Sequence, residues 1–295
     1  CIRDSPYTIT SIKEDPMPLT ESEKKGLRQQ AKQLRKDILD ITFWAGGAHV
    51  GGSLSIVEIL VLLYEKYLTI DPKNPSMEDR DRFLLSKGHA GAGLAPLLAR
   101  KGYFDFELLK SFNKFKSPFG MHLDKNKVTG LDASTGSLGH GLPMAVGLAL
   151  GARLQKKTWR AFCLLGDGEC NEGSVWEAAM AAAHYKLTNL VTIVDRNRFM
   201  VDGNTEDVMA LEPFADKWKS FGFIVKEVDG HSFEELSGAL EFALGETSAP
   251  VVIIAHTVKG KGVDFMENDG RWHYGGLDSD MLEQAKQRIE KSAAG

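Results

Sequence analysis

The sequence has few cysteines, no long apolar run and no strong net charge, and each absence narrows the class of protein. Only three of the 295 residues are cysteines, so we expect no disulfide framework and a reducing compartment, the cytoplasm. No apolar run reaches the roughly 18 residues that a membrane-spanning helix needs, and the first residues show no signal-peptide pattern. The net charge of −4 gives no electrostatic reason to expect nucleic acid or an anionic membrane as a partner.

Continuous apolar runs that alternate with helical patterns indicate the fold class. Strands are expected over 160–165, 190–195, 223–228 and 251–255, and helices over 20–44, 56–68, 139–155, 173–186, 211–220 and 232–245. Strands that are apolar throughout, rather than at every second residue, are buried on both faces. We therefore predict an α/β fold in which a parallel sheet is covered by helices on both faces.

Composition divides the chain into three parts. Residues 1–19 contain three prolines and no periodicity, and we interpret them as an N-terminal arm. The main domain is expected over 20–277, and its first helix begins with a capping box that pairs Thr20 with Glu23. The remaining residues, 278–295, predict a polar C-terminal helix.

An acidic turn follows the first regular strand. In the stretch GDGECNEG, Asp167 stands between Gly166 and Gly168, and glycines let a backbone come close to a phosphate. Asn197 follows the next strand, about 30 residues later. If the two strands are neighbours, both side chains lie at the carboxyl edge of the sheet. Carboxylate and amide oxygens suit Mg²⁺ or Ca²⁺ when phosphate oxygens complete the shell, so the turn predicts a metal and phosphate site.

Five of the eight histidines lie beside glycines or in glycine-rich loops: His49, His89, His122, His140 and His273. Zinc is the competing explanation, but no pair has the close spacing of a zinc motif. Histidines on scattered loops suit an anionic, oxygen-rich substrate, because imidazoles donate hydrogen bonds and move protons. The other three, at 184, 231 and 256, are expected to be structural.

Motifs in a fixed order carry a resemblance to a known family. They are GAHVGGSLS, LSKGHAG, GLDASTGSLGHGLPMAVGLALG, GDGECNEGSVWEA and KGKG. Together, over about residues 20–277, they resemble the N-terminal, diphosphate-binding half of transketolase, within the thiamine diphosphate-dependent enzymes. The resemblance implies a fold of that type, with thiamine diphosphate and Mg²⁺ as cofactors; Ca²⁺ or Mn²⁺ would substitute for Mg²⁺. It also implies transfer of a two-carbon ketol unit from a ketose phosphate to an aldose phosphate.

The resemblance assigns cofactor contacts to individual residues. The metal would be held by Asp167, Asn197 and the main-chain carbonyl of Phe199, and the diphosphate would lie against Gly168. The other residues implied around the cofactor are Gly136 and Leu138, beside the aminopyrimidine ring, and Gly166, His49, His89, Glu172 and His273.

Catalytic roles follow from the same resemblance. His49, His89 and His273 would surround the diphosphate and the reacting carbon, and His122 would contact the hydroxyls of the donor ketose. Glu172 would belong to an acidic contact that crosses to a second subunit.

This chain departs from the family pattern at four positions. Met121 and Leu123 flank the donor histidine where the family has Gly and Pro, and larger side chains there would narrow or reshape the donor pocket. The family has a pair of residues that ends in Asn at 196–197. Asn197 matches this pair, whereas Arg196 departs from it. His140 replaces a frequent Gln, which makes a catalytic role for it doubtful.

The resemblance also implies that the chain lacks part of the active site. The family's activating glutamate belongs to a separate pyrimidine-binding domain, which 295 residues leave no room for. Nor are there residues for the usual sugar-phosphate contacts. The two lysines of KGKG, Lys259 and Lys261, could neutralise a phosphate, but we favour a solvated loop. The chain is either a fragment or a natural subunit, and we favour a subunit that forms a heterotetramer of two such chains and two C-terminal partners.

Two other functions stay open. The chain could serve a different thiamine diphosphate enzyme, such as deoxyxylulose-phosphate synthase or a 2-oxo acid dehydrogenase, or it could be a non-catalytic cofactor-binding subunit. The sugar is also open, because split transketolases that act on apiose-derived or sulfonated sugars exist beside those that use xylulose phosphate.

Overall fold

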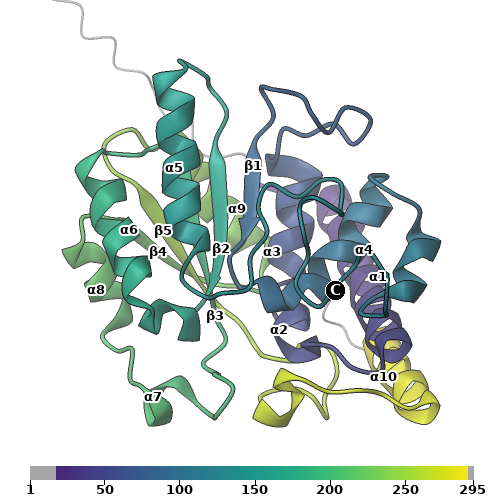
Figure 1. Ribbon diagram of the computed structural model, residues 1–295. Helices are drawn as coiled ribbons and strands as arrows, with labels where there is room; N and C mark the ends of the chain where they lie inside the picture. The colour runs from purple at the N-terminus through teal and green to yellow at the C-terminus, as the bar shows by residue number, and fades with distance from the viewer. Residues whose placement is uncertain (1–17, 292–295) are drawn as a thin grey trace, which may run out of the picture.

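A single parallel sheet forms the centre of the computed structural model, which describes residues 18–291 (Figure 1). Its five strands occur in the order β1-β2-β3-β5-β4, and every neighbouring pair is parallel. Their bounds are Arg82–Leu85 (β1), Ala161–Gly166 (β2), Leu190–Arg196 (β3), Ile224–Asp229 (β4) and Val251–His256 (β5). The four strands given bounds from the sequence are thus confirmed to within one or two residues.

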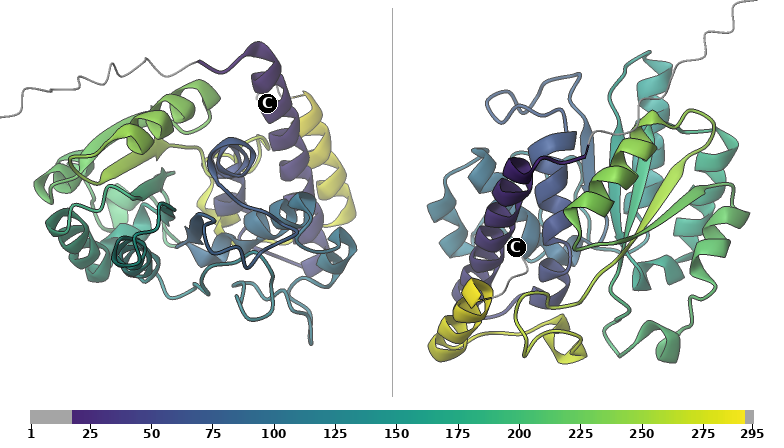
Figure 2. Two further views of the ribbon diagram at one scale, coloured as in Figure 1. Left: turned by 90° about the horizontal axis from the view of Figure 1, so that it is seen from above. Right: turned by 180° about the vertical axis from the view of Figure 1, so that it is seen from behind.

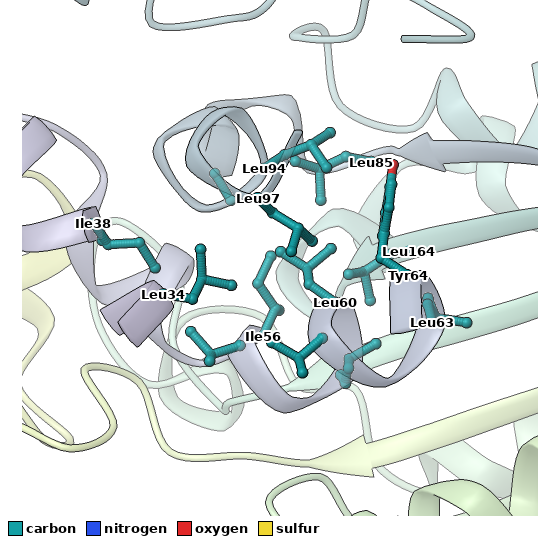
Figure 3. Packing of buried hydrophobic residues seen from close by; sticks show 14 of the residues in the cluster. Leu34, Ile38, Ile56, Leu60, Leu63, Tyr64, Leu85, Leu94, Leu97 and Leu164 are labelled. Atoms are coloured by element: carbon teal, nitrogen blue, oxygen red, sulfur yellow. The ribbon is translucent and has the colours of Figure 1, made fainter. Parts of the chain in front are cut away.

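Both faces of the sheet are buried, because successive residues of each strand enter different cores. In β2, Phe162 and Leu164 join one apolar cluster, whereas Cys163 and Leu165 join the other. The first cluster is covered by helices α1 (Glu21–Ala45), α3 (Val57–Leu62), α4 (Gly91–Lys101) and α9 (Phe233–Gly245). The second is covered by α5 (Gly141–Leu154), α6 (Gly173–His184) and α8 (Phe214–Ser220). The predicted fold class is confirmed, and Figure 3 shows strand residues Leu85 and Leu164 packed among helix leucines.

The first and last helices lie side by side. Thr20 Oγ1 accepts from the Glu23 amide at 3.2 Å, and Glu23 accepts from the Thr20 amide at 2.8 Å, so the predicted capping box is present. Helix α10 (Ser279–Lys291) runs along α1 (Figure 2), where Glu290 pairs with Lys36. Most of the predicted N-terminal arm lies outside the described residues, and the division of the chain into three parts stays a prediction.

Helix α4 was missed by the sequence patterns. It contains Gly91, Gly93 and Pro96, residues that disfavour a helix in isolation. All nine residues from Gly91 to Ala99 are buried, so packing outweighs propensity here. Packing also outweighs propensity in the short helix α2 (Val50–Leu54), which forms inside the motif GAHVGGSLS. Its two glycines are buried, Gly51 against Trp272 and Lys259 and Gly52 against Lys87.

Short single turns and irregular segments complete the described chain. They are the π-helical turn η1 (Leu63–Tyr67), which ends the predicted helix over 56–68, the 3₁₀ turns η2 (Gly88–Ala90), η3 (Phe106–Ser111), η4 (Gly168–Asn171) and η5 (Gly270–His273), and helix α7 (Thr205–Val208). Within residues 18–291, no helix combines the length and the apolar character that crossing a membrane requires.

Two glycines on α5 give a test of how this helix packs against the segment after β1. A Cβ at Gly141 would lie 2.4 Å from the Cβ of Ser86, whereas a Cβ at Gly147 would meet nothing within 4 Å. We therefore expect Gly141→Ala to lower the free energy of unfolding by about 1–3 kcal/mol. Gly147→Ala should raise it by roughly 0.5–1 kcal/mol, the usual helix preference for Ala. Urea unfolding of the purified chain measures both, and equal effects of the two substitutions would contradict the packing described.

Candidate active site

A pocket opens where the carboxyl ends of β1, β2, β3 and β5 meet. Every strand of a parallel sheet ends at this edge, so the segments that follow the strands converge on it. The lining residues that the sequence predicted are His89, Leu138, Gly166, Asp167, Gly168, Asn197, Phe199 and His273. The lining residues that the sequence patterns did not place there are Gly52, Lys87, Glu169, Met200, Val201 and Lys259.

Asp167 and Asn197 lie against two consecutive main-chain amides. The Arg198 amide donates to Asp167 Oδ2 at 2.6 Å, and the next amide, of Phe199, donates to Asn197 Oδ1 at 3.0 Å. The Gly168 amide donates to the other oxygen of Asp167 at 2.8 Å. Burial, reinforced by the charge of Asp195, raises the pKa of Asp167 to about 6. A cation bound there would compensate this buried charge.

The oxygens available for a cation are a carboxylate, an amide and main-chain carbonyls. Residues 18–291 contain no group of three or more His, Cys, Asp or Glu side chains arranged to hold a metal. A hard cation at Asp167 and Asn197 would therefore need oxygens from a ligand or from water, and this is the usual way in which Mg²⁺ binds beside phosphates. The donor set fits a magnesium–phosphate ligand.

Behind this pair, Asp195 forms a buried ion pair with Lys87. Asp195 Oδ2 also accepts from Ser55 Oγ at 2.8 Å and from Asn197 Nδ2 at 2.7 Å, and Oδ1 accepts from the Thr257 hydroxyl. Burial opposes the charge of Asp195, but Lys87 outweighs it and lowers the pKa of the carboxyl group. The side-chain orientation of Asn197, with its oxygen toward Phe199, follows from the bond to Asp195.

Glu169 joins the acidic turn to the turn before α5. Its Oε1 accepts from Ser86 Oγ at 2.5 Å and from the Gly139 amide at 2.9 Å, and its Oε2 accepts from the Gly166 amide at 3.0 Å. Burial raises the pKa of this carboxyl group. Glu169 thereby positions Leu138, the neighbour of Gly139, at the pocket.

Lys259 is buried, so its predicted setting in a solvated loop is wrong. The side chain is 2% exposed and lines the pocket, where Nζ lies 2.9 Å from His273 Nδ1. Burial and the charge of Lys87 lower the pKa of Lys259 to about 8. No carboxylate of the described chain forms an ion pair with it. A buried ammonium without a carboxylate partner is costly, and a bound anion would supply the missing charge.

The loop of Lys259 folds inward because three contacts hold it. The Gly260 amide donates to the Gly51 carbonyl at 3.0 Å. His231 Nε2 accepts from the Val258 amide at 2.8 Å, while Arg35 Nε donates to the Lys261 carbonyl at 3.1 Å. His231 is thus a structural residue, as the sequence indicated.

Four of the five histidines from the glycine-rich loops form one cluster. The ring centroid of His49 lies 5.0 Å from that of His89, 5.2 Å from that of His273 and 6.2 Å from that of His122. Burial lowers the pKa to about 4 for His49, about 2 for His89 and about 3 for His273, and nearby charges add to the effect. These three rings are therefore neutral near pH 7. The buried Nδ1 of His49 has no hydrogen-bond partner within the described chain.

The remaining predicted residues lie around this cluster or away from it. A Cβ at Gly136 would be 3.2 Å from the His122 ring, so these two residues are neighbours. Glu172 is exposed at the start of α6 and His140 is exposed at the start of α5, so neither lines the pocket.

Leu123 is buried in the core, so its side chain does not itself narrow the donor pocket, whereas a changed pocket shape stays a prediction. Its side chain is 5% exposed and belongs to the first apolar core, where it lies 3.1 Å from the position of a Cβ on Gly91. Met121 is partly buried against the same core. The departures on either side of His122 therefore fill the core beneath the loop.

Comparison with known proteins agrees with this geometry. The family model described as "Transketolase, thiamine diphosphate binding domain" matches residues 27–293. The chain belongs to the transketolase family. The predicted family and its type of fold are thereby confirmed, whereas the roles of the individual site residues stay predictions.

The chain resembles transketolases of two different lengths. The shorter ones are transketolase subunits of about the length of this chain. A 6-deoxy-6-sulfo-D-fructose transketolase subunit of Clostridium is 41% identical, over 91% of this chain and 98% of its own length. An apulose-4-phosphate transketolase subunit of Phocaeicola vulgatus is 39% identical, over 90% of this chain and 95% of its own length.

The other transketolases are longer. Human transketolase is 38% identical over 90% of this chain but only 42% of its own length. The crystal structure of Campylobacter jejuni transketolase superposes with a TM-score of 0.85 at 32% identity, over 90% of this chain and 43% of that chain. The chain therefore spans about two fifths of these long transketolases and nearly all of the transketolase subunits.

The histidine cluster predicts how the stability of this transketolase-family chain depends on pH. The folded pKa of His89 lies far below its usual value of 6.5, so the unfolded chain takes up the proton first. The contribution of His89 to the free energy of unfolding is therefore complete above pH 6.5 and falls as the pH drops below 6.5. Between pH 7.5 and 5.5 the loss from His89 is about 1.4 kcal/mol.

Urea unfolding of the chain without added cofactor measures this effect. His89→Asn should lower the pH dependence of the free energy of unfolding by that amount. His184→Asn, at the exposed end of α6, is the matched removal of a histidine outside the pocket. The same pH dependence in His89→Asn as in the wild type would contradict the buried, neutral state of His89.

Proposed function

We propose that this chain is the thiamine diphosphate-binding subunit of a two-subunit transketolase, which transfers a two-carbon ketol unit from a ketose to an aldose. The observation that carries the proposal is that buried Lys259, which pairs with no described carboxylate, lines one pocket with Asp167 and Asn197. An anion and a hard cation suit these groups at the same time, and the diphosphate and Mg²⁺ of the cofactor are such a pair.

The cofactor residues take these roles. Asp167, Asn197 and the carbonyl of Phe199 hold Mg²⁺, which Ca²⁺ or Mn²⁺ can replace, while Lys259 and the Gly168 amide contact the diphosphate. Gly166 lets the backbone approach, and Gly136 and Leu138 adjoin the aminopyrimidine ring. Thiamine diphosphate supplies the nucleophilic carbon of the reaction.

The histidines handle the sugar. Because burial keeps His49, His89 and His273 neutral near pH 7, each ring has one nitrogen that donates and one that accepts. Such rings bind hydroxyl groups and pass a proton between sugar oxygens without a buried charge. His122, at the exposed side of the cluster, contacts the hydroxyls of the donor ketose.

A second subunit completes the site. The relatives of similar length are named as subunits, and the long transketolases carry further chain beyond the matched part. We propose that the partner is a C-terminal transketolase subunit, in a heterotetramer of two plus two. Glu172 is exposed at the start of α6 and contributes to the contact with it.

The outer side of α5 is the proposed docking face. Met144 and Leu148 are only partly buried there. The same helix carries two glycines, Gly147, which is exposed, and Gly151, which is partly exposed. A Cβ at either glycine would meet nothing within 4 Å. Glycines inside a helix cost roughly 1 kcal/mol each relative to Ala. Contact with a partner helix would offset this cost, because glycines let two backbones approach closely.

The substrate is proposed as a ketose with an anionic end, and the setting as cytoplasmic carbohydrate metabolism. Relatives are named for a sulfonated fructose and for apulose phosphate, so phosphate and sulfonate are both candidate ends, beside the pentose phosphates. Cys163 and Cys170 are buried free thiols, which agrees with a reducing compartment.

Asp167→Asn tests the cofactor site. The substitution removes the charge that faces the cation but keeps the shape of the side chain. In the complex with the partner subunit, we expect Mg²⁺-dependent binding of thiamine diphosphate to be lost and ketol transfer to fall by more than 100-fold. Calorimetric titration and a coupled sugar-transfer assay measure these changes.

Asp216→Asn is the control, because Asp216 lies on α8 and pairs with Lys219 at the surface. Cofactor binding that is equally tight in Asp167→Asn would overturn the metal assignment. Decarboxylation of pyruvate or another 2-oxo acid, without ketol transfer, would assign the complex to a different thiamine diphosphate enzyme. Cofactor binding without any turnover would make the chain a cofactor-binding protein with no catalytic role.

Gly147→Gln tests the docking face. The side chain has open space in the isolated chain, so we expect its stability to be unchanged or raised, while the dissociation constant for the partner rises more than tenfold. Gly238→Gln is the matched control. It also places a side chain at a helical glycine whose Cβ meets nothing within 4 Å, but on α9, which covers the other face of the sheet. Sedimentation velocity measures assembly, and equal assembly of both variants would contradict the proposed face.

A further inference from the structure

Arg196 lies directly behind the acidic turn, at the end of β3. Its guanidinium is buried, and Nη1 donates to Asp167 Oδ2 at 3.2 Å and to Thr205 Oγ1 at 2.9 Å. Nη2 donates to Glu206 Oε1 and to Glu212 Oε1, each at 2.8 Å. One planar group therefore holds the proposed metal ligand and three residues of a later segment. Only arginine offers so many donors in a fixed plane.

That later segment, residues 199–212, borders the pocket. Phe199, Met200 and Val201 line it, and the segment then turns away through α7. Its far end is fastened to Glu206, whose carboxylate accepts from the amide of Leu211 at 3.3 Å and from that of Glu212 at 3.2 Å. The contacts of Arg196 thus tie the middle and the end of the segment to the carboxylate of Asp167, which also accepts from the Arg198 amide just before the segment.

The charge of Arg196 is balanced without Asp167. Glu206 and Glu212 lie closer to the guanidinium than Asp167 does, and Phe214 stacks near it, with the ring centroid 5.3 Å from Cζ. Because two carboxylates already compensate the arginine, the negative charge of Asp167 stays available to a cation. The contact with Asp167 fixes the direction of its side chain, and the charge of Arg196 only partly offsets the burial that raises the pKa of Asp167.

We propose that Arg196 is a positioning residue, which orients Asp167 for the cation and holds segment 199–212 over the cofactor pocket. The inference rests on the proposed function, because it takes Asp167 as a metal ligand. Arg196 itself touches neither substrate nor cofactor in this proposal. It acts through Asp167 and through the pocket residues Phe199, Met200 and Val201.

The test uses the complete complex with its partner and the variants Arg196→Met and Arg196→Lys. Met keeps an unbranched, apolar stem without the guanidinium fork, and Lys keeps the charge with a single nitrogen. In Arg196→Met, we expect the dissociation constant of thiamine diphosphate with Mg²⁺ to rise at least tenfold, with kcat at saturating cofactor within threefold of the wild type. The amides of 200–212 should exchange hydrogen faster, while β2 and β5 stay protected.

Arg80→Met is the matched control. Arg80 also pairs with a buried carboxylate, that of Asp132 at 2.6 Å, but it precedes β1 and so lies at the opposite edge of the sheet from the pocket. It should leave cofactor affinity and exchange in 200–212 unchanged. Arg196→Lys should fall between the wild type and Arg196→Met, and it also keeps the test valid if Arg196→Met does not fold.

The outcomes separate this inference from the proposed function. If the wild-type complex binds thiamine diphosphate without any need for Mg²⁺, the proposed metal site fails, whatever the variants do. If the wild type needs Mg²⁺ but the Arg196 variants bind within twofold of it and exchange equally slowly in 200–212, the positioning role of Arg196 is overturned. A loss of kcat with unchanged cofactor affinity would also overturn it.

Discussion

The buried carboxylate of Asp195 is the contact on which the arrangement of the site depends. It bonds to Lys87 after β1, Ser55 after α2, Asn197 after β3 and Thr257 after β5. A parallel sheet brings these chain segments to one edge but does not set their distances. Asp195 does so, because a carboxylate without its partners inside the protein would cost several kcal/mol, and this cost keeps all four segments in place.

The pocket combines two opposite electrostatic problems that a single ligand can solve. Asp167 is a buried anion whose pKa is raised to about 6, and Lys259 is a buried cation whose pKa is lowered to about 8. Each shift records a charge that the protein alone compensates poorly. Residues under this kind of strain occur mainly where a ligand or a reaction needs them. A ligand that carries both signs of charge would relieve both groups.

The sequence predicted the parts of the molecule that depend on local pattern. The strands were visible because their residues are apolar throughout, and Asp167 and Asn197 were visible because each follows a strand. Helix α4 was hidden because its glycines and Pro96 are tolerated only in its buried setting. The burial of Lys259 was not predicted, because the motif KGKG is typical of a polar loop. Only contacts with residues far away in the sequence, Arg35 and His231, fold that loop inward. Glu169 and Asp195 gave no signal apart from a carboxylate beside an apolar strand.

The two edge strands restrict how the chain associates with other proteins. β1 has only four residues, and β4 carries Lys226, Glu227 and Asp229 on a strand that is nowhere fully buried. Short or charged edges resist the addition of another strand. Growth of the sheet from chain to chain, the route to fibrous aggregates, is thereby disfavoured at both ends, and helix faces are left as the surfaces through which a specific assembly can form.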